Sequence, residues 1–247
     1  MRKRSIINEL KPYKPGKSIE KIQKEMGLNK VIKLASNENP LGCPINYEQL
    51  EYTIKKAHLY PDIEATNLPD SLSQKLNCSK ENIIIGNGSD DILQMLAMAY
   101  IDSQDKVLIS EHTFSIYEHV SKLMRAHIKF VPMAQFSYDL EQILSEITIE
   151  TKIIFIANPN NPTGTWCTNE QLDMFFRKVP ETCLVVIDEA YGDYASEQLN
   201  ASKIMESYSN VVILRTFSKL YGLAGFRVGY GIGNEEIIKT LNQVRQP

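Results

Sequence analysis

The sequence predicts an α/β fold with a mostly parallel sheet that is covered by helices on both faces. Short apolar runs rich in β-branched residues predict buried strands at residues 83–85, 107–109, 128–131, 153–157, 184–187, 211–214 and 228–232. Amphipathic segments lie between most of these runs. This alternation is typical of a parallel sheet, because a parallel connection has to return along the sheet and usually does so as a helix.

The helices are predicted by apolar residues that recur on one side of the segment. In residues 90–100, Ile92, Met95 and Leu96 fall on the same side of a helix. Similar patterns predict helices at residues 115–125, 140–147, 169–178 and 235–245. Thr168 and Gln171 have the spacing of a capping box, which predicts that the helix 169–178 begins directly after Thr168.

The first part of the chain lacks this alternation. Prolines interrupt it at positions 12, 15, 40, 44, 61 and 69, and one helix is predicted there, at residues 18–26. We therefore expect an arm or a lid that contributes nothing to the core of the sheet.

The composition excludes several classes of function. A net charge of −3 over 247 residues provides no basic surface for nucleic acid. No stretch is apolar and long enough for a membrane span, and the basic residues 2–4 are not followed by the apolar core of a secretory signal. The cysteines (43, 78, 167 and 183) and histidines (58, 112, 119 and 127) lack the spacing of disulfide frameworks or metal sites. We expect a cytoplasmic protein without a metal.

Residues 216–227 contain groups suited to a carbonyl and a phosphate. Lys219 stands among hydroxyls, glycines and apolar residues. Burial lowers the pKa of a lysine, which then forms a Schiff base with a carbonyl readily. Arg227 could hold a phosphate through two parallel hydrogen bonds. Taken alone, a surface lysine and an ordinary ion pair are the commoner interpretation of such residues.

Two other polar clusters follow predicted strands, at the sheet edge where ligands bind in such folds. Gly88, Ser89 and Asp90 open a helix, and its N-terminal amides favour a phosphate, although a plain helix cap is the commoner explanation. In residues 158–164, prolines fix a loop that presents asparagine side chains, for which a functional role is favoured over a structural turn.

An acid and two aromatic residues complete the candidate site. Asp188 ends a buried strand, where a carboxylate is costly unless it meets a cation such as a protonated pyridine nitrogen. Tyr191 could reach a phenolic oxygen on the same ring. Asp188 is equally explained as a cap of the next element, and Phe114, which could stack on a ring, is equally explained as a core residue.

Together these groups are the parts of a pyridoxal-phosphate site. Their order along the chain, Gly-x-Gly-Ser-Asp, Asn-Pro-Asn-Asn-Pro-Thr-Gly, Asp-Glu-Ala-Tyr and Ser-Lys-x-x-x-Leu-Ala-Gly-x-Arg, resembles the fold-type I pyridoxal-phosphate aminotransferases. The resemblance covers most of the chain, and the ordered set is highly specific.

The resemblance implies a role for each residue. Lys219 would bind the cofactor covalently and move a proton between the substrate Cα and the cofactor C4′, while Asp188 would keep the ring nitrogen protonated. Asn161 and Tyr191 would bind the ring oxygen, and Phe114 would stack on the ring. The implied phosphate contacts are the backbone of Gly88, Ser89 and Asp90, together with Thr216, Ser218 and Arg227.

Residues 10–17 and 34–42 narrow the resemblance to the histidinol-phosphate aminotransferases. This implies transfer of an amino group between L-histidinol phosphate and 2-oxoglutarate, with Tyr13 and Asn37 facing the substrate. Tyr60 would reach the cofactor phosphate of the partner subunit in a homodimer.

The resemblance also implies a domain division. Residues 1–42 would form an N-terminal arm and part of a small domain, and residues 43–247 a large cofactor-binding domain. Members of the family continue into a segment that completes the small domain and brings an arginine for the substrate carboxylate. Because this chain stops at Pro247, we expect a fragment with incomplete substrate binding.

Three alternatives stay open at this point. The substrate could instead be an aromatic amino acid, or threonine phosphate in a decarboxylation. The chain could be a truncated remnant that binds cofactor without turnover. A plain nucleotide-binding α/β domain is the third alternative.

Overall fold

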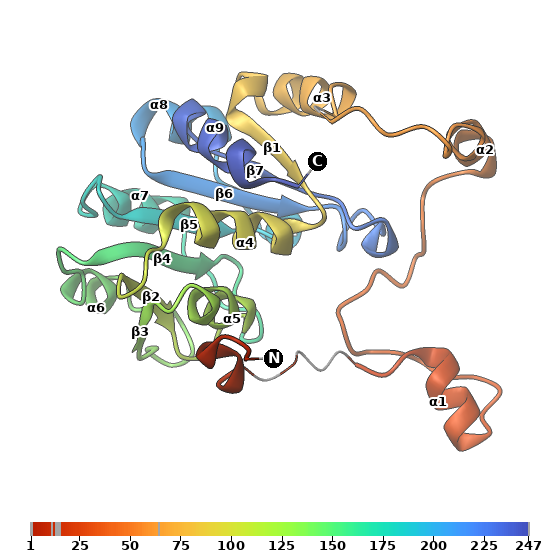
Figure 1. The fold of residues 1–247 in the computed structure, drawn as a ribbon, viewed down its shortest axis with the longest axis horizontal. Helices are drawn as coiled ribbons and strands as arrows, with labels where there is room; N and C mark the ends of the chain where they lie inside the picture. The colour runs from red at the N-terminus through yellow and green to blue at the C-terminus, as the bar shows by residue number, and fades with distance from the viewer. Residues whose placement is uncertain (1, 11, 13–15, 64, 247) are drawn as a thin grey trace.

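A seven-stranded sheet forms the centre of the fold in the computed structural model, which describes residues 2–10, 12, 16–63 and 65–246 (Figure 1). The strands are β1 (Ile83–Gly86), β2 (Lys106–Ser110), β3 (His127–Val131), β4 (Thr151–Ala157), β5 (Leu184–Asp188), β6 (Val211–Thr216) and β7 (Gly229–Ile232). Their order across the sheet is β1-β7-β6-β5-β4-β2-β3. All seven predicted strands are therefore present.

The sheet is mostly parallel, as predicted. Strands β3, β2, β4, β5 and β6 pair in parallel, whereas β7 is antiparallel to both of its neighbours, β6 and β1. The carboxyl ends of β1, β2, β4, β5 and β6 thus meet at one edge, because β1 runs in the same direction as β6. The polar clusters predicted from the sequence all follow strands that end there.

The predicted helices are present, with ends that differ by a few residues. They are α4 (Ser89–Tyr100), α5 (Ile116–Leu123), α6 (Leu140–Ser145), α7 (Asn169–Phe176) and α9 (Glu235–Val244). The predicted capping box of α7 forms, with Thr168 and Gln171 each bonded to the backbone of the other. Helices α2 (Tyr47–Lys55), α3 (Asn67–Leu76) and α8 (Ala201–Ser207), and the short 3-10 turns η1 (Ser5–Asn8), η2 (Lys80–Asn82), η3 (Gly192–Tyr194) and η4 (Ala224–Phe226), were not predicted.

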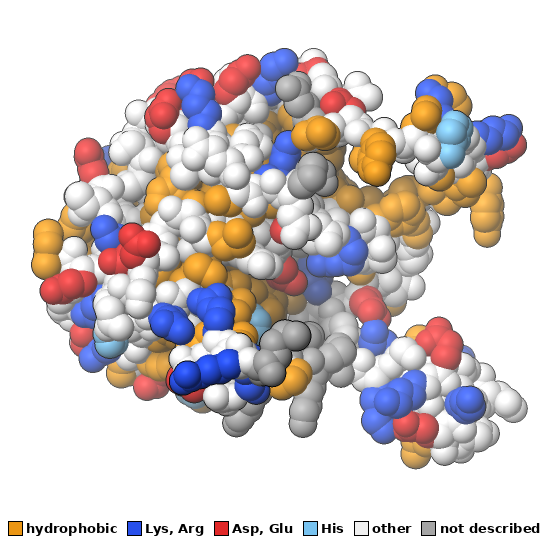
Figure 2. All heavy atoms as spheres, in the orientation of Figure 1, with side chains coloured by type: hydrophobic (Ala, Val, Ile, Leu, Met, Phe, Trp, Pro, Cys, Tyr) orange, Lys and Arg blue, Asp and Glu red, His pale blue; other side chains and the backbone are white. Residues whose placement is uncertain are grey.

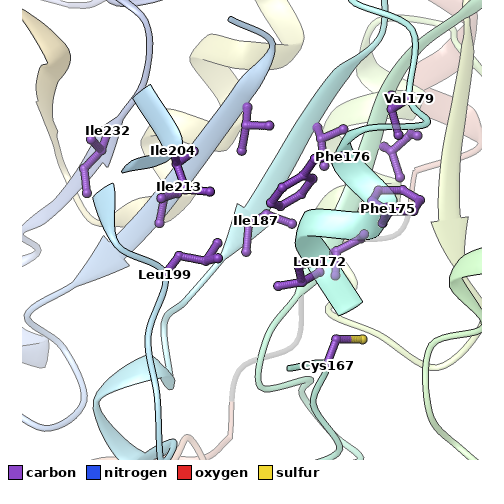
Figure 3. Packing of buried hydrophobic residues seen from close by; sticks show 14 of the residues in the cluster. Cys167, Leu172, Phe175, Phe176, Val179, Ile187, Leu199, Ile204, Ile213 and Ile232 are labelled. Atoms are coloured by element: carbon purple, nitrogen blue, oxygen red, sulfur yellow. The ribbon is translucent and has the colours of Figure 1, made fainter. Parts of the chain in front are cut away.

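Two apolar layers hold the helices on the sheet. Alternate side chains of β5 point to opposite faces, so that Val185 and Ile187 enter one layer and Leu184 and Val186 the other. The first layer packs against α3, α6, α7 and α8, and Figure 3 shows Phe176 lying over Ile187 within it. The second layer packs against α4, α5 and α9. Burial on both faces explains why the strands read as continuous apolar runs.

The expectation of a buried strand at 128–131 was wrong for most of its residues. Within β3 only Val131 is buried, and Phe130 is 40% exposed. Strand β3 is an edge strand with β2 as its single neighbour, and it is less covered than the other edge strand, β1, which packs against α3, α4 and α9. An apolar run does not report its place in the strand order.

The N-terminal part lies largely outside this body, as expected for an arm. The helix predicted at residues 18–26 is present as α1 (Ile19–Met26), and it begins after Ser18, whose hydroxyl accepts from the backbone nitrogen of Lys21. Helices α1 and α2 stand away from the sheet in Figure 1, and no strand lies among the described residues before β1. The first turn, η1, packs back on the body through the buried Ile6 and a hydrogen bond from Arg4 to the carbonyl of Leu123. Residues 36–39 also return to the body, through hydrogen bonds with Lys219, Tyr191 and Leu220.

The arm carries many exposed apolar side chains, some of which are visible around α2 in Figure 2. They are Met26, Leu28, Ile32, Leu34, Leu41, Tyr47, Tyr52, Ile54, Leu59, Tyr60 and Ile63. In the described part of the chain, no helix is long and apolar enough to cross a membrane. The predicted domain boundary between residues 42 and 43 stays a prediction.

Candidate active site

A pocket of about 470 Å³ opens at the edge of the sheet where the parallel strands end. The loops after β4, β5 and β6, the start of α4 and a piece of the arm line it. Of the residues predicted for the site, the pocket brings together Asn37, Ser89, Asp90, Phe114, Asn161, Asp188, Tyr191, Thr216, Ser218, Lys219 and Arg227. Residues from six separate segments of the sequence therefore meet at one place.

One end of the pocket gathers hydrogen-bond donors. Helix α4 begins at Ser89, so its first backbone amides point into this end. Arg227 donates from Nη1 to the hydroxyl of Ser218 at 3.2 Å, and Thr216 donates to the same hydroxyl at 3.0 Å. A helix N-terminus, a guanidinium and hydroxyls in one place form a site for an anion such as phosphate.

Gly88 makes this arrangement possible. Its φ is +83°, and a Cβ added there would lie 2.3 Å from Nη2 of Arg227. A Cβ on Gly229 would likewise lie 2.4 Å from the backbone nitrogen of Ser89. The two glycines let β7, the guanidinium and the start of α4 approach one another without a side chain between them.

Lys219 lies at the mouth of the pocket. Its Nζ donates to the carbonyl of Ser36 at 3.0 Å and stands 5.5 Å from the ring centre of Tyr191. Burial lowers the pKa of Lys219, against the opposing effect of the Asp90 carboxylate. A lower pKa leaves more of the amine unprotonated near neutral pH, which is the form that attacks a carbonyl.

Asp188 lies on the floor of the pocket and is 4% exposed. Its Oδ2 accepts from the hydroxyl of Tyr117 at 2.8 Å, and its Oδ1 accepts from the backbone nitrogen of Ala190 at 3.0 Å. Burial raises the pKa of Asp188 to about 6, although both hydrogen bonds oppose the rise. Among the described residues, no cation forms an ion pair with this carboxylate.

The asparagines of the loop after β4 divide into two kinds. Asn158 and Asn160 are buried and fix the loop. Asn158 makes two hydrogen bonds with the backbone of Cys167: its Nδ2 donates to the carbonyl, and its Oδ1 accepts from the nitrogen. Asn160 accepts from Thr113 and Tyr138. Asn161 instead lines the pocket, between two X-Pro bonds that are both cis.

Tyr191 and Asn37 meet over the pocket. Tyr191 follows β5 and accepts at its hydroxyl oxygen from Nδ2 of Asn37 at 2.8 Å. Asn37 belongs to the arm, where Ser36 and Asn37 have φ of 79° and 50°, so the backbone turns sharply across the pocket. Residues 36–38, called the strap below, therefore cover the mouth next to Lys219.

Phe114 lines the pocket wall and packs edge-on against Tyr117, with 5.7 Å between ring centres. Its predicted stacking on a ligand ring stays a prediction. Tyr60 is 99% exposed and lies in the segment that follows α2, outside this pocket. Tyr13 lies outside the described residues.

Sequence reasoning missed Tyr117 and the strap residues Ser36 and Glu38. Tyr117 falls on the apolar side of α5 and has the pattern of an ordinary core aromatic. The strap lies more than a hundred residues from Lys219, so only the tertiary fold places it there. Among the described residues, no group of three or more histidine, cysteine, aspartate or glutamate side chains could hold a metal ion.

Comparison with known proteins gives a consistent result. The family model described as aminotransferase class I and II matches residues 29–247. Histidinol-phosphate aminotransferase of Moorella thermoacetica is 46% identical over 248 residues, which cover 99% of this chain and 64% of that protein. Histidinol-phosphate aminotransferase of Bacillus subtilis (strain 168) is 41% identical, with 100% of this chain and 70% of that protein covered.

Solved structures agree with this match. Histidinol-phosphate aminotransferase from Sinorhizobium meliloti, in complex with pyridoxal-5'-phosphate, superimposes with a TM-score of 0.87 at 28% identity and covers 99% of this chain. Aspartate aminotransferase from Thermus thermophilus with maleate shares the fold, with a TM-score of 0.83 at 22% identity. The chain spans about two thirds of the length of these proteins, namely 66% and 68%.

Proposed function

The chain belongs to the family of class I and II aminotransferases, and from this membership we propose that it binds pyridoxal phosphate and transfers an amino group between L-histidinol phosphate and 2-oxoglutarate. One observation carries the proposal. Lys219, the buried Asp188, and Arg227 with the start of α4 beside it face the same pocket of about 470 Å³.

The residues present fit this cofactor. When bound, pyridoxal phosphate supplies an aldehyde and a pyridine ring that accepts electrons from the bond to be broken. The donors around Ser89, Ser218 and Arg227 suit its phosphate. Asp188, which has no cationic partner among the described residues, suits its ring nitrogen in the protonated form.

We assign the reacting groups accordingly. Lys219 would hold the aldehyde through its Nζ, and its free amine would be the base that moves the proton of the substrate Cα. Asn161 and Tyr191 bind the ring oxygen, and Phe114 covers one face of the ring. Gly88 and Asp90 contribute backbone to the phosphate site, and Thr216 supports Ser218 there.

The choice of substrate rests on the names of relatives. Histidinol-phosphate aminotransferases with 38–46% identity align over nearly the whole chain. We propose that Asn37 faces the substrate, because it lies on the strap above Lys219, and that Tyr13 does the same.

We propose a homodimer in which the arm binds the partner subunit and Tyr60 reaches the partner's phosphate site. The support is the exposure of the residues before α3, since Tyr60 is 99% exposed and many other apolar side chains there are exposed too. The proposed domains are the arm with part of a small domain, residues 1–42, and the large domain, residues 43–247. A cytoplasmic location is part of the same proposal, because all four cysteines are free thiols.

The test begins with cofactor binding. The purified chain is incubated with pyridoxal phosphate, reduced with borohydride and digested, and the modified peptide is identified by mass spectrometry. We expect the modification on Lys219, and no modification of that peptide in Lys219→Ala. An unmodified Lys219 in the wild-type chain would contradict the proposal and favour a plain nucleotide-binding domain.

The second step identifies the substrate. Histidinol phosphate, an aromatic amino acid and threonine phosphate are added in turn, and the visible absorbance of the bound cofactor is followed. We expect histidinol phosphate to remove the absorbance fastest. If one of the other two compounds removed the absorbance faster, that compound would replace histidinol phosphate as the proposed substrate. No response to any donor would indicate a remnant that binds the cofactor without turnover.

A further inference from the structure

Tyr117 is completely buried beneath the pocket, with 0% of its surface exposed. Its ring stacks on Phe155, with 4.9 Å between ring centres and 1° between ring planes, and packs edge-on against Phe114. These contacts fix the direction of the phenol. Its hydroxyl donates to Oδ2 of Asp188 at 2.8 Å.

The hydroxyl can only act as a donor in this contact. A phenol has one proton, and an ionised carboxylate accepts but does not donate. Burial raises the pKa of Tyr117 well above its ordinary value, and the neighbouring Asp188 charge acts in the same direction. The phenol therefore keeps its proton throughout the pH range in which enzymes of this kind work.

The carboxylate of Asp188 is left with one free lone pair on each oxygen. Oδ2 accepts from Tyr117 and Oδ1 from the backbone of Ala190. The other titratable groups near it act through space, namely Asp90, Glu189, Tyr138, Tyr191 and Lys219. Asp90 and Glu189 disfavour a further negative charge, so the two hydrogen bonds work against them.

We propose that Tyr117 is a positioning residue that lowers the proton affinity of the Asp188 carboxylate and thereby keeps the proton on the nitrogen of a bound pyridine ring. The inference rests on the proposed function, which places that nitrogen against Asp188. In a hydrogen-bonded pair, the proton stays with the more basic partner. A donor on the far side of the carboxylate makes the carboxylate less basic, and the ring nitrogen then retains the proton.

The variant Tyr117→Phe removes the donor and keeps the ring. The matched control is Tyr138→Phe, because Tyr138 is also buried and its hydroxyl bonds to the backbone nitrogen of Ala157 and to Asn160, not to Asp188. A third protein carries 3-fluorotyrosine at position 117, whose more acidic hydroxyl is a stronger donor. The fluorinated side chain should lower the proton affinity of Asp188, whereas Tyr117→Phe should raise it. Because it retains the tyrosine ring, it also provides a test if Tyr117→Phe fails to fold.

The main measurement is nitrogen NMR of pyridoxal phosphate labelled at the ring nitrogen and bound to each protein across neutral pH. In the wild type and in Tyr138→Phe we expect the shift of a protonated pyridine. In Tyr117→Phe we expect a shift toward the unprotonated value, with an apparent pKa of the ring nitrogen lower by about one unit, or about tenfold. Identical ring-nitrogen shifts in the wild type and in both position-117 proteins would overturn the inference.

A second measurement needs no cofactor. Carbon NMR of labelled aspartate follows the titration of the Asp188 carboxyl in the cofactor-free chain, and we expect its pKa to rise by about one unit in Tyr117→Phe and to fall with 3-fluorotyrosine. An unchanged Asp188 titration in both proteins overturns the inference as well. Failure of the wild-type chain to bind the cofactor would instead overturn the proposed function.

Discussion

Asp188 and Glu189 are adjacent in the chain, and both are buried, at 4% and 3% exposure. Among the residues that the structure describes, only Glu189 pairs with a cation. Glu189 lies behind the pocket and pairs with the buried Arg215, with 2.9 Å between Nε and Oε2 and 2.8 Å between Nη2 and Oε2. Asp188 faces the pocket and accepts only from neutral donors. The difference shows which charge the fold balances itself and which it leaves for a ligand.

The two arginines of the region differ in the same way. Arg215 has a side chain that is 8% exposed, and its Nη2 also contacts the carbonyl of Leu199. Arg227 has a side chain that is 43% exposed, and its nearest carboxylate, on Asp90, is 4.0 Å away. One arginine belongs to the framework and the other is available to a phosphate.

The framework pair also closes the loop that carries Tyr191. Oε1 of Glu189 accepts from the backbone nitrogen of Leu199, while Arg215 donates to the carbonyl of that same residue. The chain from 189 to 199 is thus held at both ends by one ion pair. Tyr191 lies within the loop that these contacts close.

Arg215→Met should have the largest effect, because it leaves the Glu189 carboxylate buried without a partner. We expect the free energy of unfolding to fall by about 3–5 kcal/mol, measured by urea denaturation at neutral pH. The double variant Glu189→Met with Arg215→Met should recover most of the loss, since no buried charge remains. A loss below about 1 kcal/mol in the single variant would show that Glu189 is not balanced by Arg215.

Asp188→Asn should raise the free energy of unfolding of the cofactor-free chain, whereas Arg215→Met lowers it. A carboxyl whose pKa is raised by folding, here to about 6, favours the folded state when protonated, and this contribution is lost as the pH rises from about 4 through 6. The asparagine removes the charge and should raise the free energy of unfolding at pH 7 by on the order of 2–3 kcal/mol.

The same variant should bind pyridoxal phosphate more weakly, which is measured by fluorescence titration. Its stability advantage should shrink as the pH falls toward about 4, where the wild-type carboxyl is protonated as well. A variant that is less stable than the wild type at pH 7 would mean that Asp188 already has a partner that balances its charge.

Arg227→Met should change stability by less than about 1 kcal/mol, because its guanidinium is half exposed and its hydrogen bonds are long. We expect cofactor affinity to fall by at least about tenfold at the same time, since charge-assisted phosphate contacts are strong. Equilibrium dialysis with pyridoxal phosphate measures the affinity. If stability fell as far as in Arg215→Met, the proposed division between framework and ligand charges would be wrong.

Lys178→Ala gives the smallest effect and sets the baseline for an exposed charge. Lys178 pairs with Glu141 at 2.5 Å, and the two side chains are 53% and 77% exposed. We expect a change in unfolding free energy of at most about 0.5 kcal/mol, which vanishes in high salt. A larger change would show that an ion pair can stabilise this protein through proximity alone, without burial.

Much of the fold was predictable because burial on both faces of the sheet leaves its mark on each strand separately. The runs 184–187 and 211–214 are apolar throughout, and the structure buries all of their residues. The antiparallel direction of β7 depends on strand order, and the exposure of β3 depends on how few helices cover it; no local sequence pattern records either. Helices α3 and α8 were missed because each packs on the sheet through few residues, such as Leu72 and Ile204, and so shows only a weak apolar pattern.

The candidate site was predictable where its residues follow strands. Asp188 and Lys219 lie next to strand ends, and parallel strands bring such ends together. The sequence could not show that Asn160 fixes the loop while Asn161 lines the pocket, because the two asparagines are adjacent and lie between the same two prolines. Tyr117 and the strap depend on packing between distant segments, so their part in the site becomes visible only in three dimensions.

The position of β7 makes the anion site depend on a contact between distant parts of the chain. Strand β1 joins the sheet through β7 alone, yet 142 residues separate the end of β1 at Gly86 from the start of β7 at Gly229. The contact of Gly229 with Ser89 therefore joins two parts of the chain that are far apart in the sequence, and the anion site needs both of them in place.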